Sequence, residues 1–106
     1  MPEHVAYCVS KAAVVQLTRI FAVALAPMKI NVNCVNPGLV EGGMLAGALN
    51  KPAERKRLEG YQPWGRFAKP EEIADAVAYL ASDAADFVTG SAFTIDGGRM
   101  LEFIRT

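Results

Sequence analysis

The stretch Lys29-Ile-Asn-Val-Asn-Cys-Val35, followed by Asn36-Pro37-Gly38, decides the fold of this 106-residue chain. Its valines and isoleucine favour a β-strand, and the Pro-Gly pair ends the strand. Residues 5–26, just before it, are rich in alanine and leucine, contain no glycine or proline and stop at Pro27, so they predict one long helix. A long helix that leads directly into an apolar strand is typical of α/β proteins.

The rest of the chain continues this alternation. The further elements expected are short helices at Met44–Leu49 and Ala53–Leu58, a helix at Pro70–Ser82, a helical turn at Asp83–Phe87 and a strand at Ala92–Ile95. Pro70, with Glu71 and Glu72 behind it, suits the first turn of a helix. Strands that alternate with helices predict an α/β fold with a parallel sheet.

Composition and charge exclude several kinds of protein. Lysine plus arginine and aspartate plus glutamate number 11 each, so no basic stripe favours nucleic acid as a partner. Hydrophobic residues make up 52% of the chain, which is too many for a disordered protein. Cys8 and Cys34 belong to no Cys-x-x-Cys pair, so we expect no metal site and two reduced, buried thiols.

The first residues and the apolar stretches indicate a cytoplasmic protein. Pro2, Glu3 and His4 follow Met1 at once, so no signal peptide is visible. The apolar stretch Ile20–Ala26 is far shorter than the roughly 20 residues that a membrane span needs. We therefore expect no membrane partner.

The predicted helix Val5–Ala26 is apolar on more than one face. One face carries Val9, Ala13, Leu17, Ile20 and Ala24, and another carries Ala12, Val15, Ala22 and Leu25. A helix that is apolar on most sides is buried on most sides. One face is expected to pack on a sheet and the other on a second helix or subunit, so we expect a homo-oligomer through this helix.

Only two strands are clear in the sequence, and this raises a packing problem. Parallel strands are normally covered on both faces. Two strands and a few helices leave apolar faces open, which a stable domain avoids. Packing alone therefore predicts that residues 1–106 form a single but partial domain.

Tyr7 and Lys11 lie four residues apart near the start of the long helix, so their side chains share a face. A tyrosine ordinarily titrates near pH 10 and exchanges protons poorly at neutrality. An ammonium about 4 Å from a phenol favours the phenolate by roughly 4 kcal/mol at an effective dielectric of about 20. The pair therefore suits general acid–base chemistry on an alcohol or carbonyl oxygen. The spacing alone is weak evidence, because two residues at this spacing are usually a half-exposed tyrosine beside a solvated lysine.

Several runs of sequence, in the right order, resemble the short-chain dehydrogenase/reductase family. They are Tyr7-x-x-Ser10-Lys11-Ala12-Ala13, Ile30-Asn-Val-Asn33-x-Val35-x-Pro37-Gly38-x-Val40, Gly65-Arg66-Phe67-x-x-Pro70-Glu71-Glu72-Ile73-Ala74, and the closing segment with Asp83–Phe87, Thr89-Gly90 and Ile95-Asp96-Gly97-Gly98. The resemblance covers residues 5–98. It implies the C-terminal portion of a doubly wound, Rossmann-type parallel sheet that lacks its N-terminal βαβ units.

The resemblance also implies a role for each matching position. Tyr7 is expected to be the catalytic acid/base and, with Lys11, to contact the cofactor. Lys11 is expected to hold the nicotinamide ribose hydroxyls and to lower the pKa of Tyr7. Pro37, Gly38 and Val40 are expected to face the nicotinamide of NAD or NADP, with the Val40 backbone bonding its carboxamide. The substrate implied is a small alcohol or ketone.

Several other residues have both a functional and a structural explanation. Leu39 and Met44 are expected to line the substrate side, and ordinary core packing explains them equally well. Trp64 is expected to be a buried loop anchor rather than a cap on the pocket. Asn33 and Asp96 are expected to be structural.

The chain also departs from the family pattern. No Gly-x-Gly-x-x-Gly opens a helix, the family's catalytic serine lies upstream of the tyrosine, and Gly42 stands where a cofactor-contacting threonine is common. Two hypotheses follow. The chain is the C-terminal part of an NAD(P)-dependent oxidoreductase, or it is a truncated, non-catalytic chain that acts through association with itself or a larger relative. In either case we expect the isolated chain not to bind the dinucleotide.

Overall fold

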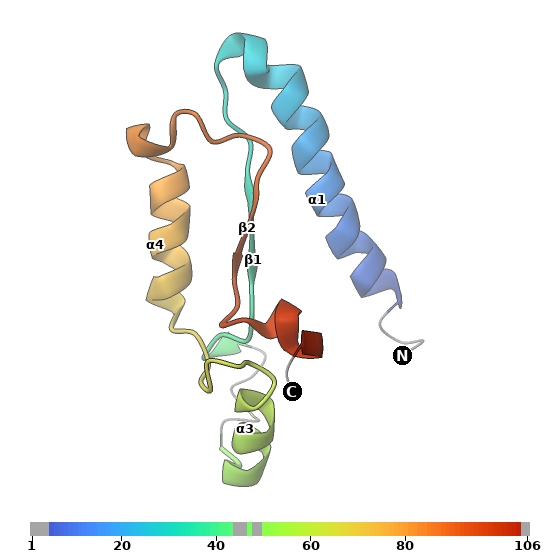
Figure 1. Ribbon diagram of the computed structural model, residues 1–106, viewed down its shortest axis with the longest axis vertical. Helices are drawn as coiled ribbons and strands as arrows, with labels where there is room; N and C mark the ends of the chain where they lie inside the picture. Colours follow the sequence, from blue (N-terminus) through green and yellow to red (C-terminus); the bar gives the residue numbers. More distant parts are fainter. Residues whose placement is uncertain (1–4, 44–46, 48–49, 105–106) are drawn as a thin grey trace. The chain divides into compact units, whose positions relative to one another are not determined.

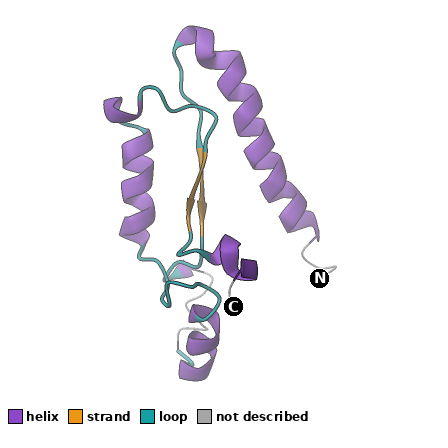
Figure 2. Cartoon of the chain, in the orientation of Figure 1, coloured by secondary structure: helices purple, strands orange, loops and turns teal. Residues whose placement is uncertain are grey.

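The computed structural model describes residues 5–43, 47 and 50–104 (Figure 1 and Figure 2). Its elements are α1 (Val5–Leu25), a 3₁₀ turn (Ala26–Met28), β1 (Cys34–Pro37), α3 (Pro52–Glu59), α4 (Pro70–Leu80), a second 3₁₀ turn (Asp83–Ala85), β2 (Ala92–Ile95) and a third 3₁₀ segment (Arg99–Ile104). The chain divides into two compact units. Unit 1 comprises Met1–Cys34 with Tyr79–Phe93, and unit 2 comprises Val35–Ala78 with Thr94–Thr106.

Strands β1 and β2 pair in a two-stranded sheet, drawn in orange in Figure 2. The Cys34 N–H donates to the Ser91 carbonyl at 3.0 Å, and the Gly38 N–H donates to the Ile95 carbonyl at 2.9 Å. Both bonds join residues that are equally far apart in sequence, as only a parallel pair allows. The predicted parallel sheet and α/β class are therefore confirmed, and β2 has the bounds expected from the sequence.

The predicted strand from Lys29 is wrong at its start, because β1 begins only at Cys34. Side-chain hydrogen bonds explain the difference, since the Val32 N–H donates to the Thr89 hydroxyl at 3.0 Å instead of to a ladder carbonyl. The Asn31 amide donates to the carbonyls of Ala85 and Asp86 at 3.0 and 2.9 Å. Asn33 bonds to the residues before β2 in the same way, which confirms its structural role.

The helices follow the sequence closely. Helix α1 ends one residue before the predicted Ala26 and passes into a 3₁₀ turn that contains Pro27. Lys29 then adopts a left-handed conformation with φ of 59°, and its N–H donates to the Ala26 carbonyl at 2.9 Å. Helix α4 begins at Pro70 as expected, and α3 confirms the helix predicted at Ala53–Leu58. The helix predicted at Met44–Leu49 lies largely outside the described residues.

Few side chains are fully buried within the described chain. Ala22, Phe67 and Ala85 are the buried apolar residues there, and Thr18 and Gln62 are the buried polar ones. In unit 1, Tyr79 at the end of α4 meets Phe93 of β2 edge to face, with ring centroids 6.4 Å apart. The scarcity of buried side chains agrees with a partial domain whose apolar faces are open.

Exposed apolar side chains are concentrated on α1. Those of Val5, Val9, Val14, Leu17, Ile20, Phe21 and Val23 are all exposed. The cysteines follow the same trend, since Cys8 is exposed and Cys34 is half-buried, and both are free. The expectation of two buried thiols is therefore wrong, because no described residue covers the face of α1 that carries Cys8.

The apolar stretch around Ile20–Ala26 is longer than the sequence analysis allowed. Within the described residues, one stretch, Cys8–Met28, is 21 residues long and apolar enough to cross a membrane by length and composition alone. The run lengthens because alanines and valines precede Ile20. The core helix of a soluble protein passes the same test.

Candidate active site

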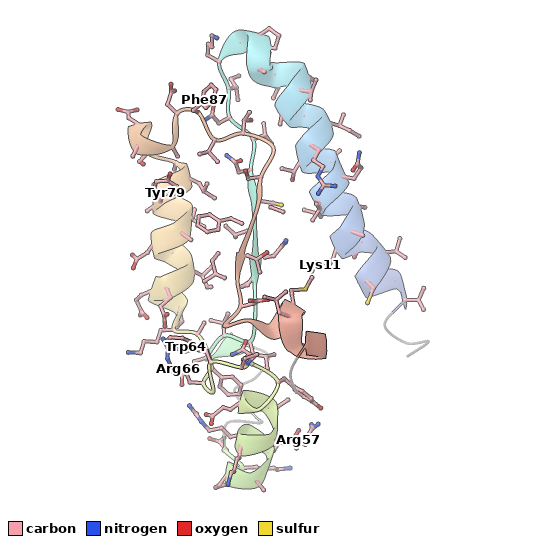
Figure 3. All side chains as sticks on the ribbon, in the orientation of Figure 1. Lys11, Arg57, Trp64, Arg66, Tyr79 and Phe87 are labelled. Carbon is pink, nitrogen blue, oxygen red and sulfur yellow. The ribbon has the colours of Figure 1, made fainter. Side chains whose placement is uncertain are left out.

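The two expected catalytic residues lie on α1 in unit 1. Tyr7 and Lys11 both fall within the helix Val5–Leu25, one turn apart, so the expectation that they share a face is confirmed at the level of the backbone. The Lys11 side chain is exposed and is labelled in Figure 3. A helix without internal glycine or proline provides a rigid support for such a pair.

The expected cofactor loop lies in unit 2 and starts where β1 ends. Pro37 is the last residue of β1, and the Gly38 N–H is still bonded to the Ile95 carbonyl. A Cβ atom at Gly38 would lie 2.8 Å from the Cα of Asp96, closer than real Cβ contacts come. Glycine is therefore required here by the close approach of two backbones.

Asp96 holds the other side of this approach. Its Oδ1 accepts from the Gly98 N–H and its Oδ2 from the Met100 N–H, each at 2.9 Å. The carboxylate thus caps the 3₁₀ segment that starts at Arg99. These bonds confirm the structural role expected of Asp96.

Val40 forms an isolated parallel bridge with Ala68. The Ala68 N–H donates to the Leu39 carbonyl and the Glu41 N–H donates to the Ala68 carbonyl, both at 2.9 Å. Because peptide groups alternate along an extended chain, the N–H and C=O of Val40 itself point away from Ala68. Across the described residues, neither group of Val40 has a hydrogen-bond partner. A donor and an acceptor presented side by side suit a primary carboxamide.

A residue that the sequence did not reveal fixes this loop from behind. Gln62 is only 2% exposed. Its Oε1 accepts from the Leu39 N–H, and its Nε2 donates to the Arg66 carbonyl. A single glutamine in a glycine-rich segment forms no motif, so only its burial identifies it.

Trp64 does not have the role expected of it. The tryptophan is 74% exposed and is labelled in Figure 3, so the prediction of a buried loop anchor is wrong. Its backbone N–H donates to the Gly97 carbonyl at 3.0 Å, which holds the chain there without burying the indole. The buried anchor is Gln62, two residues earlier. Together these two residues line part of an open pocket of about 270 Å³ in unit 2.

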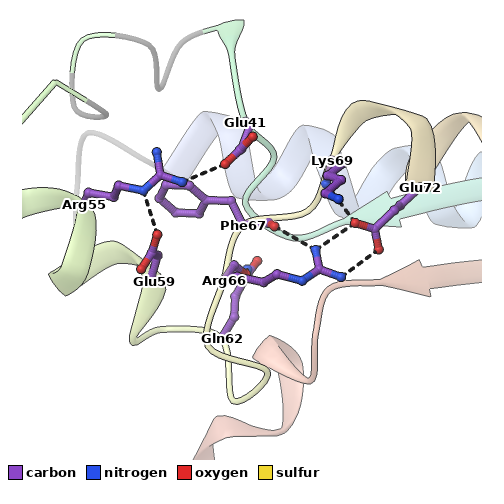
Figure 4. A network of polar contacts seen from close by, with 8 residues as sticks. All are labelled: Glu41, Arg55, Glu59, Gln62, Arg66, Phe67, Lys69 and Glu72. Atoms are coloured by element: carbon purple, nitrogen blue, oxygen red, sulfur yellow. Dashed lines mark hydrogen bonds and ion pairs between the residues drawn. The ribbon is translucent and has the colours of Figure 1, made fainter. Parts of the chain in front are cut away.

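Arg55 connects α3 to the loop beyond Val40, as Figure 4 shows. Its Nε donates to Glu59 and its Nη2 to Glu41, both at 2.7 Å. The guanidinium also lies over the ring of Phe67, 5.3 Å from its centroid. Leu39, expected on the substrate side, is half-buried at the start of this region, and Met44 lies outside the described residues.

The segment behind the loop is held by a second ion pair, also drawn in Figure 4. The Arg66 guanidinium donates to both carboxylate oxygens of Glu72, at 2.7 and 3.2 Å. The Lys69 N–H donates to the same carboxylate at 3.1 Å, so Glu72, the third residue of α4, accepts from the residue before the helix as in a capping box. The hydrogen bond from Arg66, followed by that from Lys69, lowers the pKa of Glu72 to about 2.

The chain is similar to known proteins over most of its length. Residues 1–99 match the family model described as enoyl-(acyl carrier protein) reductase. The 2-(S)-hydroxypropyl-CoM dehydrogenase 3 of Xanthobacter autotrophicus is 44% identical over 102 residues, covering 92% of this chain and 40% of that protein. The NAD-dependent glycerol dehydrogenase of Listeria innocua is 44% identical, covering 92% and 38%. An inactive 2-(S)-hydroxypropyl-CoM dehydrogenase 2, also from Xanthobacter, is 46% identical, covering 92% and 44%.

Solved structures agree with the sequence matches. A short chain dehydrogenase family protein from Francisella tularensis superposes with a TM-score of 0.84 at 37% identity, covering 92% of this chain and 44% of that one. A 4-hydroxyisoleucine dehydrogenase complexed with NADH superposes with a TM-score of 0.86 at 32% identity, covering 91% and 40%. The chain thus spans about two fifths of the length of the curated relatives it matches. It belongs to the short-chain dehydrogenase/reductase family and has part of that family's Rossmann-type α/β fold.

Proposed function

We propose that this chain carries the C-terminal, acid–base part of an NAD(P)-dependent oxidoreductase that interconverts a small alcohol and a ketone. The observation that carries the proposal is the backbone of Val40, whose N–H and C=O are presented together, with no partner among the described residues. Family membership and the placement of Tyr7 and Lys11 on one helix face support it. Relatives that match are named as dehydrogenases of alcohols.

In this proposal Tyr7 moves the proton of the reaction. Its phenol donates a proton to the carbonyl oxygen during reduction, and its phenolate takes the proton from the alcohol during oxidation. Lys11, one helical turn away, favours the phenolate through its positive charge and holds the ribose hydroxyls. The bound dinucleotide supplies or accepts the hydride.

The chain's residues fit the nicotinamide end of NAD or NADP. Val40 offers a backbone donor and acceptor to the carboxamide, and Gly38 lets the loop that carries Val40 lie directly against Asp96 because it has no side chain. Pro37 fixes the backbone ahead of the turn. Leu39 and Met44 are proposed to line the substrate side. Gly42, with φ of 91°, replaces the hydroxyl that often helps to hold the cofactor, so this chain relies more on the backbone of Val40.

The pyrophosphate and adenosine need a further site. A pyrophosphate is ordinarily held at a glycine-rich turn that opens a helix, and the 106 residues contain no such pattern. The proposal therefore places that turn, and the catalytic serine, in a segment outside these residues. An in-frame glycine-rich turn and a serine are expected in the coding sequence upstream of the Met1 codon. An unrelated upstream sequence counts against the proposal.

A second candidate function is association without catalysis. It is favoured by the open apolar faces of α1, where Val23 is 77% exposed, and by the inactive relative at 46% identity. Such a chain acts by binding a second copy of itself or a larger relative. Gel filtration beside a titration with NADH and NADPH separates the two functions. Saturable binding by the 106-residue chain would rule out the non-catalytic function.

The proposal also places the protein in the cytoplasm, with α1 as an internal helix of the enzyme. Its support is the α/β architecture in which α1 leads into a parallel sheet. Flotation of the expressed protein with lipid vesicles tests this point, because a spanning helix floats with the vesicles and an internal helix does not.

A further inference from the structure

Among the described residues of unit 2, Gln62 is the most deeply buried polar one, at 2% exposure, and neither the motifs nor the expected site includes it. Its amide joins two segments that are otherwise separate in sequence, the loop after β1 and the segment before α4. It accepts from the Leu39 N–H and donates to the Arg66 carbonyl. Buried polar groups are normally hydrogen-bonded, and here both the oxygen and the nitrogen of the amide have a partner.

Only a glutamine satisfies both segments. The Leu39 N–H requires an acceptor and the Arg66 carbonyl requires a donor, so the orientation of the amide is fixed by its partners. Glutamate keeps the acceptor but lacks the donor proton when ionised, and leucine lacks both. Asparagine is shorter by one methylene. The position also depends on Gly38, because the Cβ of any other residue there would collide with the Gln62 amide.

The bond to Gln62 completes a set of three that hold one side of the loop. The Leu39 N–H is held by Gln62, and the Leu39 carbonyl and Glu41 N–H are held by Ala68. Ala68 thus holds both peptide groups that flank Val40, and Gln62 holds the preceding peptide, between Gly38 and Leu39, so that Gln62 acts on Val40 through Leu39. The orientation of the Val40 N–H and C=O follows from those contacts. A peptide group that is already oriented binds a ligand without the free-energy cost of reorienting.

We infer that Gln62 is a positioning residue that orients the Val40 peptide groups toward the nicotinamide carboxamide. This inference rests on the proposed function for its second half, the carboxamide. Its first half, the control of the Leu39–Val40 backbone by Gln62, concerns the chain alone and is tested separately.

The first experiment measures amide hydrogen exchange by NMR in the 106-residue chain. In Gln62→Leu, protection of the Leu39 N–H is expected to fall by about tenfold or more, because a buried donor loses its acceptor. Gln62→Glu is expected to lose protection at neutral pH, because an ionised carboxylate is repelled by the Arg66 carbonyl and moves away from both partners. It is expected to regain protection at low pH, where the protonated carboxyl again donates to that carbonyl. A positioning role restores protection at the Leu39 N–H in particular, whereas a merely structural role restores it evenly across unit 2.

Two control variants separate positioning from loss of stability. Phe67→Leu removes buried apolar volume from the same unit but leaves both Gln62 bonds, so it is expected to lower protection across unit 2 and not at Leu39 in particular. Tyr61→Phe changes an exposed neighbour and is expected to change little. Uniform loss in Gln62→Leu, matching that in Phe67→Leu, or no pH dependence in Gln62→Glu, overturns the inference.

The second experiment uses the longer protein that contains the upstream segment. There Gln62→Leu is expected to raise the KM for the dinucleotide about tenfold while kcat falls much less, because the carboxamide contact is loosened and the acid–base pair is not. An unchanged KM with a lowered kcat overturns the second half of the inference. If the wild-type longer protein binds no dinucleotide, the proposed function fails, while the exchange data still decide what Gln62 does to Leu39.

Discussion

The Arg66 guanidinium and the Glu72 carboxylate form a bidentate ion pair, which links the segment after Gln62 to the first turn of α4. Arg66 is bound from its other side as well, since its carbonyl accepts from the Gln62 amide. The same short segment thus supports the loop after β1 through Gln62 and begins helix α4 through Glu72. The stability of this segment is therefore expected to affect both the loop after β1 and helix α4.

The first prediction concerns pH. Arg66, and then the Lys69 N–H, lower the pKa of Glu72 from an ordinary 4.5 to about 2 in the folded chain. Between pH 4.5 and 2 the unfolded chain therefore binds more protons than the folded chain. The stability that Glu72 contributes is fully present above pH 4.5 and is lost as the pH falls toward 2. Urea unfolding from pH 7 to 2.5 is expected to show this decline.

Glu72→Gln provides the comparison for that titration. The variant is expected to be less stable than the wild type at pH 7 and to show a flatter pH profile below 4.5. Glu71→Gln, at the neighbouring exposed position, is the matched control and is expected to keep the wild-type profile. Identical profiles for wild type and Glu72→Gln would show that the ion pair does not persist in solution.

The second prediction tests the close approach of Gly38, in the loop after β1, to Asp96. Gly38→Ala is expected to destabilise the chain by about 1–3 kcal/mol, because its Cβ would meet the Asp96 Cα at 2.8 Å and the backbone has to shift. Gly47→Ala is the matched control, since a Cβ at Gly47 meets nothing within 4 Å. Urea midpoints measure both. Equal midpoints for the two variants would contradict the tight packing at Gly38.

The sequence predicted the architecture well where local chemistry decides it. Pro70 fixes the start of α4 because its ring suits the first helical turn, and Pro27 ends α1 within the adjacent 3₁₀ turn. Ala92–Ile95 is a strand with the expected bounds. The parallel pairing followed from the alternation of helices and strands. These features depend on residues that are close together in the chain.

The sequence failed where distant residues decide the outcome. The strand start moved from Lys29 to Cys34 because the Val32 N–H bonds to the Thr89 hydroxyl, more than fifty residues away. Gln62, for which no role was expected from the sequence, is the buried anchor in place of Trp64, since that role depends on the Leu39 N–H that only the folded chain brings near. A glutamine in a loop has no periodicity by which such a partner is predicted.

The third prediction concerns the attachment of α3. Arg55→Met is expected to increase amide exchange in α3 about two- to fivefold, because it removes the partly exposed ion pairs with Glu41 and Glu59. Arg57→Met is the matched control, since Arg57 pairs within α3, with Glu54, and not with the loop. The same increase should appear in the wild type at about 1 M salt, where exposed pairs are screened. Unchanged exchange in both conditions would mean that the ion pairs of Arg55 do not hold the helix.

The fourth prediction concerns catalysis in the longer protein. Tyr7→Phe is expected to reduce kcat by about 10²–10⁴-fold while leaving the dissociation constant of the dinucleotide nearly unchanged, because the phenol moves a proton and the cofactor is held elsewhere. Cys8→Ala, at an exposed neighbouring position on α1, is the control and is expected to retain its activity. Stopped-flow and steady-state assays distinguish the two constants. Retention of most of the rate by Tyr7→Phe would remove the acid/base assignment.

The last prediction concerns the open face of α1. Val14, Leu17 and Phe21 follow one another at helical spacing, and each is about half exposed, with Leu17 at 51%. Such a stripe is expected to associate, because water is excluded when two of them meet. Leu17→Glu is therefore expected to reduce the apparent mass in gel filtration without lowering the urea midpoint of the monomer. Gln16→Glu introduces the same charge one residue away, about 100° around the helix, and is expected to leave the apparent mass unchanged. If both variants, or neither, alter the apparent mass, this stripe is not the surface through which the chain associates.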